Sequence, residues 1–341
     1  MIAKLPRRTM LRHAAAGAAI LASPAILTSG ARAAPFRFKL ATTILPAQPL
    51  NAYVKQAAAA VRAESHGQVS IKVFPGYELG SSTSVMSEVR DGSIEMATFS
   101  GAILANVLEV SSIYNLAFIF KDYDQIWTTM DGKLGDYLRA QIEGIGLHAL
   151  DKIWNLGFRQ ITTSTKPIKT PEDLKGVKIR VAVAPLILSA FKALGAAPAA
   201  INFNELFTAL QTKVVDGQEN DLFQIWKGDL YEVQKYCAMT NHIWDGYYFF
   251  INGRIWNGLP GDVKTLIATK FNDAAVQQRQ AVIDSFGPAQ TELAKKGLIF
   301  NDVDRESFKL VLKNAGFYAH WQKTFGPKVW SLLEESVGSL T

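Results

Sequence analysis

Arg180 stands where a guanidinium group could capture an acid. In the segment Val177–Val181 apolar residues alternate with basic ones, which predicts a strand with Arg180 on the face opposite its apolar residues. The arginine falls near the carboxyl end of that strand, which is where ligands bind in open α/β sheets. Because the guanidinium fork matches a carboxylate with two parallel hydrogen bonds, the chemistry that we expect is the binding of an organic acid.

Further polar residues fall on either side of this strand in the sequence. The segment Asp216–Asn220 is rich in donors and acceptors, and we interpret it as a polar loop that follows a short helix capped by Asn204. Arg159 lies in a segment that we interpret as a crossing between two lobes, where it could reach both walls of a cleft. The alternative for Arg159 is a salt bridge between the lobes.

Signatures of catalysis are missing from the sequence. It contains no G-x-S-x-G, no phosphate loop and no H-E-x-x-H, and its five histidines are scattered: His13, His66, His148, His242 and His320. Cys237 is the only cysteine, so no intrachain disulfide and no cysteine-rich metal site can form. We therefore expect a protein that is not an enzyme and holds neither metal nor cofactor. One catalytic possibility remains, namely that Glu219 and His242 meet in space.

The pattern of strands and helices predicts an α/β fold. Residues 36–40 and 69–73 alternate as strands on either side of a helix, which implies a parallel pair with a right-handed crossover. A third strand ends at Ser100, whose hydroxyl would be either a ligand donor or a helix cap. The apolar run Tyr247–Ile251 is typical of a buried parallel strand that returns to the first lobe.

Helices are predicted over residues 124–138 and 229–238, together with a long helix that begins near Pro260. We expect the long helix to run to about Ser285, because Gly287-Pro288 should break or bend it there. The chain crosses between the lobes more than once, so each lobe is discontinuous. We predict residues 34–156 and 246–285 in one lobe and residues 157–245 and 286–341 in the other.

The N-terminal residues have the composition of an export signal. Arg7-Arg8 precedes an apolar run from Ala14 to Leu27 and a cleavage-like site at Ala33, which predicts a signal peptide over residues 1–33 with a twin-arginine appearance. Its removal takes away five of the 36 basic residues and none of the 30 acidic ones, so the net charge falls from +6 to +1. Nucleic-acid binding therefore loses its electrostatic support.

The runs DLKGVKIR (residues 173–180) and FNELFTALQTKVVDGQEN (residues 203–220) resemble the substrate-binding proteins of TRAP transporters, the DctP-type family. The resemblance extends over essentially the whole mature chain. It implies a two-lobe periplasmic-binding-protein fold, with each lobe a mostly parallel sheet flanked by helices, hinge strands between the lobes and a long bridging helix. It also implies a periplasmic, monomeric solute receptor that delivers its ligand to a small and a large integral membrane subunit.

The resemblance implies roles for particular residues. Arg180 would form the main salt bridge to a ligand carboxylate, Arg159 would add a second contact, Asn220 would bond the same end, and Phe203 would pack on the ligand body. Further aromatic residues could line an apolar pocket, namely Trp154, Trp244, Tyr247 and Tyr248. Such a pocket favours an aromatic or branched monocarboxylate. A C4-dicarboxylate, a sugar acid, a sensory receptor and an exported enzyme on the same scaffold stay open as alternatives.

Overall fold

A mixed sheet of 11 strands runs through residues 36–341, the part of the chain that the computed structural model describes. The strands are β1 (Phe36–Thr42), β2 (Val69–Phe74), β3 (Met96–Ser100), β4 (Leu147–Ala149), β5 (Trp154–Thr163), β6 (Lys178–Val181), β7 (Ala197–Ala200), β8 (Gly217–Asp221), β9 (Tyr236–Met239), β10 (Trp244–Asn252) and β11 (Ile299–Asp302). Their main order is β2-β1-β3-β10-β5-β8-β6-β7, with β4 paired to β10, β9 to β5, and β11 to β9.

Two long strands, β5 and β10, join the halves of this sheet. The pairs β1–β2 and β1–β3 are parallel in one half, and β6–β7, β6–β8 and β9–β11 are parallel in the other. By contrast, β10 is antiparallel to β3, β4 and β5, so the expectation of a parallel strand over Tyr247–Ile251 is wrong. A continuous apolar run indicates burial on both faces of a strand, but it carries no information about the direction of its neighbours.

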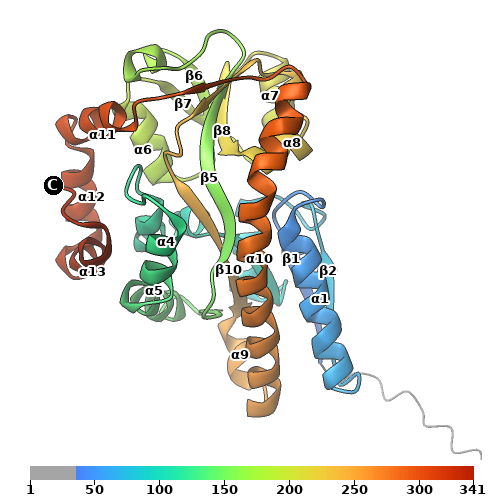
Figure 1. Ribbon diagram of the computed structural model, residues 1–341. Coiled ribbons are helices and arrows are strands. Elements are labelled where there is room, and N and C mark those ends of the chain that lie inside the picture. The colour runs from blue at the N-terminus through green and yellow to red at the C-terminus, as the bar shows by residue number, and fades with distance from the viewer. Residues whose placement is uncertain (1–35) are drawn as a thin grey trace, which may run out of the picture. The chain divides into compact units, whose positions relative to one another are not determined.

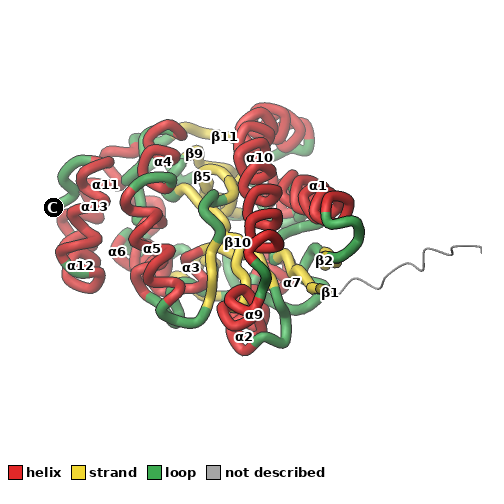
Figure 2. Tube along the Cα trace, turned by 90° about the horizontal axis from the view of Figure 1, so that it is seen from below, coloured by secondary structure: helices red, strands yellow, loops and turns green. Residues whose placement is uncertain are grey.

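Helices cover both faces of the sheet (Figures 1 and 2). They are α1 (Pro49–Glu64), α2 (Ser82–Asp91), α3 (Gly101–Leu104), α4 (Tyr123–Met130), α5 (Lys133–Glu143), α6 (Pro185–Ala193), α7 (Phe203–Gln211), α8 (Leu222–Lys227), α9 (Gly253–Gly258), α10 (Gly261–Lys295), α11 (Arg305–Asn314), α12 (Phe317–Phe325) and α13 (Pro327–Val337). Short 3₁₀ helices span Glu109–Asn115, Pro171–Leu174 and Leu230–Glu232. Among the described residues, none of the helices has both the length and the apolar character needed to cross a bilayer.

The long helix α10 runs for 35 residues and passes through Pro288 without ending, so the expected end near Ser285 is wrong. Proline removes one N–H from the helix ladder, which would leave the carbonyl of Asp284 without its partner. Both Asp284 and Pro288 are exposed, so water can satisfy that carbonyl at little cost. The helix can therefore extend along both halves of the sheet, beside α1 at its first end and α8 at the other (Figure 1).

Side chains in the middle of α10 form hydrogen bonds with the start of β5, one of the two strands that join the halves of the sheet. The side chain of Gln278 accepts a hydrogen bond from the backbone N–H of Asn155 at 2.9 Å and donates one to its carbonyl at 2.7 Å. Arg279 donates to the carbonyl of Ile153 at 3.0 Å and pairs with Asp131 at 2.7 Å. These contacts fix the start of β5, and thus the backbone from which Arg159 projects.

Three local predictions failed where the side chains are polar or mixed. Residues 216–220 are not a loop, because Gly217–Asp221 forms the buried strand β8. Residues 229–238 contain a short 3₁₀ helix and β9 in place of one helix. The helix predicted over residues 124–138 is divided into α4 and α5 at Gly132, where a Cβ atom would lie 2.6 Å from the carbonyl oxygen of Thr128.

The architecture is the two-lobe periplasmic-binding-protein fold with a long bridging helix, as the resemblance implied. The lobe boundaries given above stay a prediction. The predicted signal peptide, residues 1–33, lies outside the described residues.

Candidate functional site

A cavity lies between the two halves of the sheet and takes side chains from both. The space in it that water-sized groups could occupy is about 30 Å³. Its lining comprises Tyr77, Ser82, Ser100, Ala102, Ile103, Arg159, Arg180, Ala182, Val183, Ile187, Asn202, Phe203, Asn220, Gln224, Asp245 and Tyr247. Six of the nine residues predicted to line the site are in this set, namely Arg180, Arg159, Asn220, Phe203, Ser100 and Tyr247.

Arg180 is a buried cation without a counter-ion. It projects from β6, is 3% exposed, and has no carboxylate within ion-pair distance among the described residues. Its Nε donates to the carbonyl of Ile201 at 2.8 Å, while Nη1 is buried without a hydrogen-bond partner. Burial lowers the pKa of Arg180 to about 10, although Glu219 acts in the opposite direction. An uncompensated buried charge is costly, so an anion placed beside Arg180 would be stabilised there.

Arg159 is held by two carboxylates, in contrast to Arg180. Its Nε pairs with Glu219, its Nη2 donates to Glu219 Oε1 at 2.9 Å, and its Nη1 donates to Asp245 Oδ2 at 3.1 Å. Burial alone would lower the pKa of Arg159, but Glu219 and then Asp245 outweigh it and raise that pKa above its usual value. Arg159 thus lines the cavity, and its ion pairs with Glu219 and Asp245 stay within the predicted lobe of residues 157–245, so they are not the salt bridge between the lobes that was the alternative.

Ser100 caps helix α3, which is one of the two roles that were open for it, and it lines the cavity; its role as a ligand donor stays a prediction. Its hydroxyl donates to Asp245 Oδ1 at 2.6 Å, and its oxygen accepts from the N–H of Ala102 as the N-cap of α3. The carboxylate of Asp245 is therefore shared between Ser100 and Arg159. Burial raises the pKa of Asp245, and Arg159 counteracts this shift.

Asn220 and Phe203 approach the cavity from β8 and α7. The carbonyl oxygen of the Asn220 side chain accepts from Arg159 Nη2 at 3.0 Å, and its amide donates to Gln218 at 2.7 Å. Phe203 begins α7, with Asn202 and not Asn204 at the N-cap. Its ring stacks on Tyr77 at 5.8 Å and lies 5.9 Å from the guanidinium carbon of Arg180. The carboxylate end of the cavity thus has an aromatic wall.

Glu219 and His242 do meet in space. His242 Nε2 lies 3.5 Å from Glu219 Oε2, and both side chains are buried behind Arg159 and do not line the cavity. Burial would raise the pKa of Glu219, but Arg159 and the nearby His242 bring it to about 2. Burial lowers the pKa of His242, against the effect of Glu219. A carboxylate already bound to a guanidinium is a weak base, so this pair is arranged to position Arg159.

Asp221 is a third buried acid near the cavity, and unlike Glu219 and Asp245 it has no cation within ion-pair distance among the described residues. Its Oδ1 accepts from the N–H of Gln224 at 2.9 Å and from Gln48 at 3.4 Å, while Oδ2 is buried without a partner. Burial raises the pKa of Asp221 to about 6. The folded protein therefore keeps the Asp221 proton to higher pH than the unfolded chain does, so this group makes folding less favourable as the pH rises from about 4 to 6.

We expect Asp221→Asn to stabilise the protein at pH 8 and to have little effect near pH 3. A pKa shift of about two units corresponds to roughly 2 to 3 kcal/mol of unfolding free energy. Urea unfolding at both pH values measures the difference. The exposed Asp273 provides the matched control, since Asp273→Asn should change neither value. Equal effects of the two substitutions at pH 8 would contradict the assignment.

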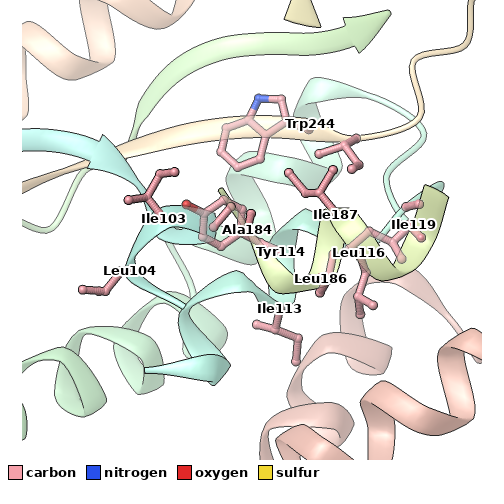
Figure 3. Close-up of a cluster of buried hydrophobic side chains, with 14 of the residues drawn as sticks. Ile103, Leu104, Ile113, Tyr114, Leu116, Ile119, Ala184, Leu186, Ile187 and Trp244 are labelled. Atoms are coloured by element: carbon pink, nitrogen blue, oxygen red, sulfur yellow. The ribbon is translucent and has the colours of Figure 1, made fainter. Parts of the chain in front are cut away.

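Trp244 and Trp154 were predicted to line the cavity. They belong to the core and are not among its lining residues. Trp244 is 1% exposed, and its indole N–H donates to Asn155 Oδ1 at 2.9 Å. Figure 3 shows it in a cluster with Tyr114, Ile103 and Ile187. Trp154 is fully buried in a hydrophobic cluster that includes residues of α1 and α10. The sequence shows that these residues are aromatic, but it does not distinguish an aromatic residue that lines a cavity from one that packs in the core.

We expect Trp244→Phe to weaken folding and to leave ligand affinity unchanged. The smaller ring leaves a void and removes the bond to Asn155, which should cost about 1 to 3 kcal/mol. Denaturant unfolding and calorimetric titration with the ligand measure the two effects. A large loss of affinity at unchanged stability would return Trp244 to the site.

The sequence analysis missed several cavity residues, chiefly Tyr77, Gln224 and Asp245. Tyr77 lies in a loop with a left-handed backbone, φ +67°, after Pro75-Gly76, and nothing in its type marked it. Gln224 is on α8, just beyond the strand that we took for a loop. Asp245 was visible as the single acid between Trp244 and Gly246, but its partner Arg159 is 86 residues away.

The chain matches known proteins over most of its length. Residues 40–319 match the profile of the family described as "Bacterial extracellular solute-binding protein, family 7" (DctP). The chain is 32% identical over 291 residues to the 2,3-diketo-L-gulonate-binding periplasmic protein YiaO of Escherichia coli, covering 85% of this chain and 88% of the relative. It is 30% identical over 240 residues to the C4-dicarboxylate-binding periplasmic protein DctP of Rhodobacter capsulatus, covering 70% and 72%.

Solved structures agree with this assignment. A TRAP periplasmic solute-binding protein from Polaromonas sp. JS666, bound to D-erythronate, superposes with a TM-score of 0.83 at 28% identity and covers 87% of this chain and 98% of its own. These similarities coincide with a cavity between two lobes and a buried guanidinium inside it. The chain therefore belongs to the DctP family of extracellular solute-binding proteins, the periplasmic receptors of TRAP transporters.

Proposed function

We propose that this protein binds a small organic acid with a single negative charge in the cavity between its lobes and delivers it to the membrane subunits of a TRAP transporter. The observation that supports the proposal is the environment of Arg180. It is buried, has no acid partner, and keeps Nη1 without a hydrogen bond. A carboxylate bound there supplies the missing charge and the missing acceptor at once.

The charge balance of the cavity favours a monoanion over a dicarboxylate. Arg159 is already paired with Glu219 and Asp245, so it offers little uncompensated charge to a second carboxylate. Among the described residues that line the cavity, Arg180 is the one cation that has no carboxylate partner. A second ligand carboxylate would have to be buried next to Asp245, and burying like charges together is unfavourable.

Other residues of the lining favour a ligand body that is part apolar and part polar. Ile103 and Ile187 supply apolar surface, while Gln224 supplies an amide whose Oε1 is buried without a partner. A hydroxyl group on the ligand can donate to that oxygen. The case for a purely aromatic ligand is weaker than the sequence suggested, since Trp154, Trp244 and Tyr248 are absent from the lining.

Closure over the ligand is supported by hydrogen bonds that already connect the two lobes. Gln48 donates to Asp221, Asn202 to Thr83 at 3.4 Å, and Asn106 to the carbonyl of Val183 at 2.8 Å. Such contacts enclose the cavity and exclude water from the ion pair. In a dry cavity the pair with Arg180 is far stronger than an exposed one, which contributes about 0 to 1 kcal/mol.

A second candidate is a polyhydroxylated acid. The names of relatives support it, since one binds 2,3-diketo-L-gulonate and a structural neighbour holds D-erythronate. The polar side chains of Ser82, Asn202 and Asn220 in the lining could bond several hydroxyl groups. A C4-dicarboxylate is supported by the relative from Rhodobacter capsulatus, against the charge balance of the cavity.

A thermal-shift screen tests the proposal. The panel pairs each monocarboxylate with its neutral amide, with a dicarboxylate of equal length, and with its hydroxylated analogue. We expect a hydroxylated monocarboxylate to raise the melting temperature most, because a ligand that binds only the folded state stabilises it by mass action. A shift produced equally by an acid and its amide would exclude the role of Arg180. Recovery of a chemically altered acid would point to the exported enzyme.

A further inference from the structure

Arg305, at the start of α11, is partly buried and, like Arg180, has no carboxylate within ion-pair distance in the described part of the chain. Of the arginines in the described chain that are not exposed, only these two lack a carboxylate within ion-pair distance. Arg305 Nη2 donates to the carbonyls of Phe120 at 3.3 Å and Asn241 at 3.1 Å. Its Nε is buried without a hydrogen-bond partner. Its guanidinium carbon lies 5.9 Å from the ring of Phe118, the same separation as between Arg180 and Phe203.

Arg305 lines a second pocket, which is distinct from the cavity around Arg180. This pocket is open to solvent and has a volume of about 220 Å³; its lining comprises Phe118, Ile119, Phe120, Lys121, Gln125, Arg305, Glu306, Lys309 and Val337. Three of these residues are cationic and one is acidic. Neither Lys121 nor Lys309 has an ion pair within residues 36–341, and Glu306 lies beyond ion-pair distance of Arg305. The pocket therefore carries a local excess of positive charge.

Among the uncharged residues of the pocket, Gln125 is polar and the other four are apolar. Phe118, Ile119 and Phe120 come from the segment before α4, and Val337 ends α13. Phe118 has a left-handed backbone, φ +61°, which is strained for an aromatic residue. Its N–H donates to the carbonyl of His242 at 2.6 Å, and this bond holds the strained residue in place. A guanidinium beside an apolar wall is the usual composition of a small-molecule pocket.

This pocket adjoins the charge network behind the first cavity. Arg305 bonds the carbonyl of Asn241, and the next residue, His242, lies 3.5 Å from Glu219, which holds Arg159. Residues 240–242 thus separate the two cavities, with one unpaired arginine on each side. Burial lowers the pKa of Arg305, as it does for Arg180, and a bound anion would relieve that penalty in both places.

We propose that the pocket around Arg305 is a second anion site, which takes the carboxylate of a small organic acid with an apolar body. The carboxylate lies against Arg305 and Lys309, and the apolar body lies on Phe118 and Val337. The site is independent of the ligand bound at Arg180, because no residue lines both cavities.

The test uses 4-fluorobenzoate as the probe and fluorine NMR as the readout, in an Arg180→Met background that removes the anion partner of the first cavity. We expect saturable binding in that background, which Arg305→Gln weakens by about tenfold or more and Lys309→Gln weakens less. The neutral probe 4-fluorobenzamide should not compete. Lys313→Gln is the matched control, because Lys313 is exposed on the same helix and outside the pocket.

Two outcomes would overturn the second site. One is the absence of saturable binding up to about 10 mM probe, which is weaker than any specific ion pair with apolar contact should give. The other is binding that neither Arg305→Gln nor Lys309→Gln alters. Since Arg305→Gln removes two bonds to backbone carbonyls, its melting temperature is compared first, and Lys309→Gln, which leaves those bonds intact, decides the case if the arginine variant is unfolded.

Discussion

Replacing Arg180 with methionine is expected to abolish measurable ligand binding and to leave the ligand-free protein as stable as before, or more stable. Truncating one partner of a buried ion pair costs about 3 to 5 kcal/mol, which corresponds to a loss of affinity of roughly 10² to 10³·⁵. In the ligand-free protein Arg180 has no such partner, and burial holds its pKa at about 10, well below its usual value. A charge that folding disfavours is removed by the substitution.

The combination of these two results separates a binding role from a structural one. Calorimetric titration with the acid found in the thermal-shift screen measures affinity, and urea unfolding without ligand measures stability. Arg254→Met is the matched control, because Arg254 is also held by a backbone carbonyl, that of Asp91, but lies outside the cavity. Tight binding that survives Arg180→Met would refute the proposed site, and a large loss of ligand-free stability would make Arg180 a structural residue.

Replacing Glu219 with glutamine is expected to destabilise the protein more than any of the other substitutions proposed for it. Glu219 is fully buried and pairs with Arg159, whose charge would keep only Asp245 as a carboxylate partner. Breaking a buried pair by removing one charge costs about 3 to 5 kcal/mol. The cost arises because the remaining cation stays buried.

Two comparisons make this prediction specific. Glu335→Gln breaks an exposed ion pair with Lys133 and should cost at most about 1 kcal/mol. The pKa of Glu219 is lowered to about 2, so its contribution is present above pH 4.5 and is lost as the pH falls toward 2. The difference between Glu219→Gln and the native protein should shrink over that range. Similar costs for the two substitutions at pH 7 would show that the buried network does not stabilise the fold in this way.

The two arginines of the cavity differ in their partners, and this difference could allow the cavity to select its ligand. Arg159 is fixed by Glu219, Asp245 and Asn220, so it shapes the cavity and adds little net charge. Arg180 is held only through a backbone carbonyl and the face of Phe203, so its charge stays available. A rigid, neutralised group beside a free cation favours one carboxylate in one orientation. In the proposed binding mode, the network behind Arg159 would contribute to selectivity without touching the ligand.

The sequence by itself determined the elements whose residues follow simple periods. Alternation in residues 36–40, 69–73 and 177–181 predicted β1, β2 and β6, and the strand position of Arg180 predicted its place at the cavity. The family resemblance supplied the two-lobe fold. These inferences held because alternation records which face of a strand is buried, and a charged residue at a strand end is accessible from the sheet edge.

Only the tertiary structure decided which polar residues are buried together. The strand β8 is made of polar side chains that bond to β5, as Gln218 does to Thr162 at 2.8 Å, so no hydrophobic period marks it. Trp244 and Phe203 are both large aromatics, yet one packs the core and the other faces Arg180. The partners of Arg159 lie 60 and 86 residues away in the chain. Whether an arginine is neutralised depends on those distant carboxylates, because Coulomb attraction acts through space and leaves no local pattern in the sequence.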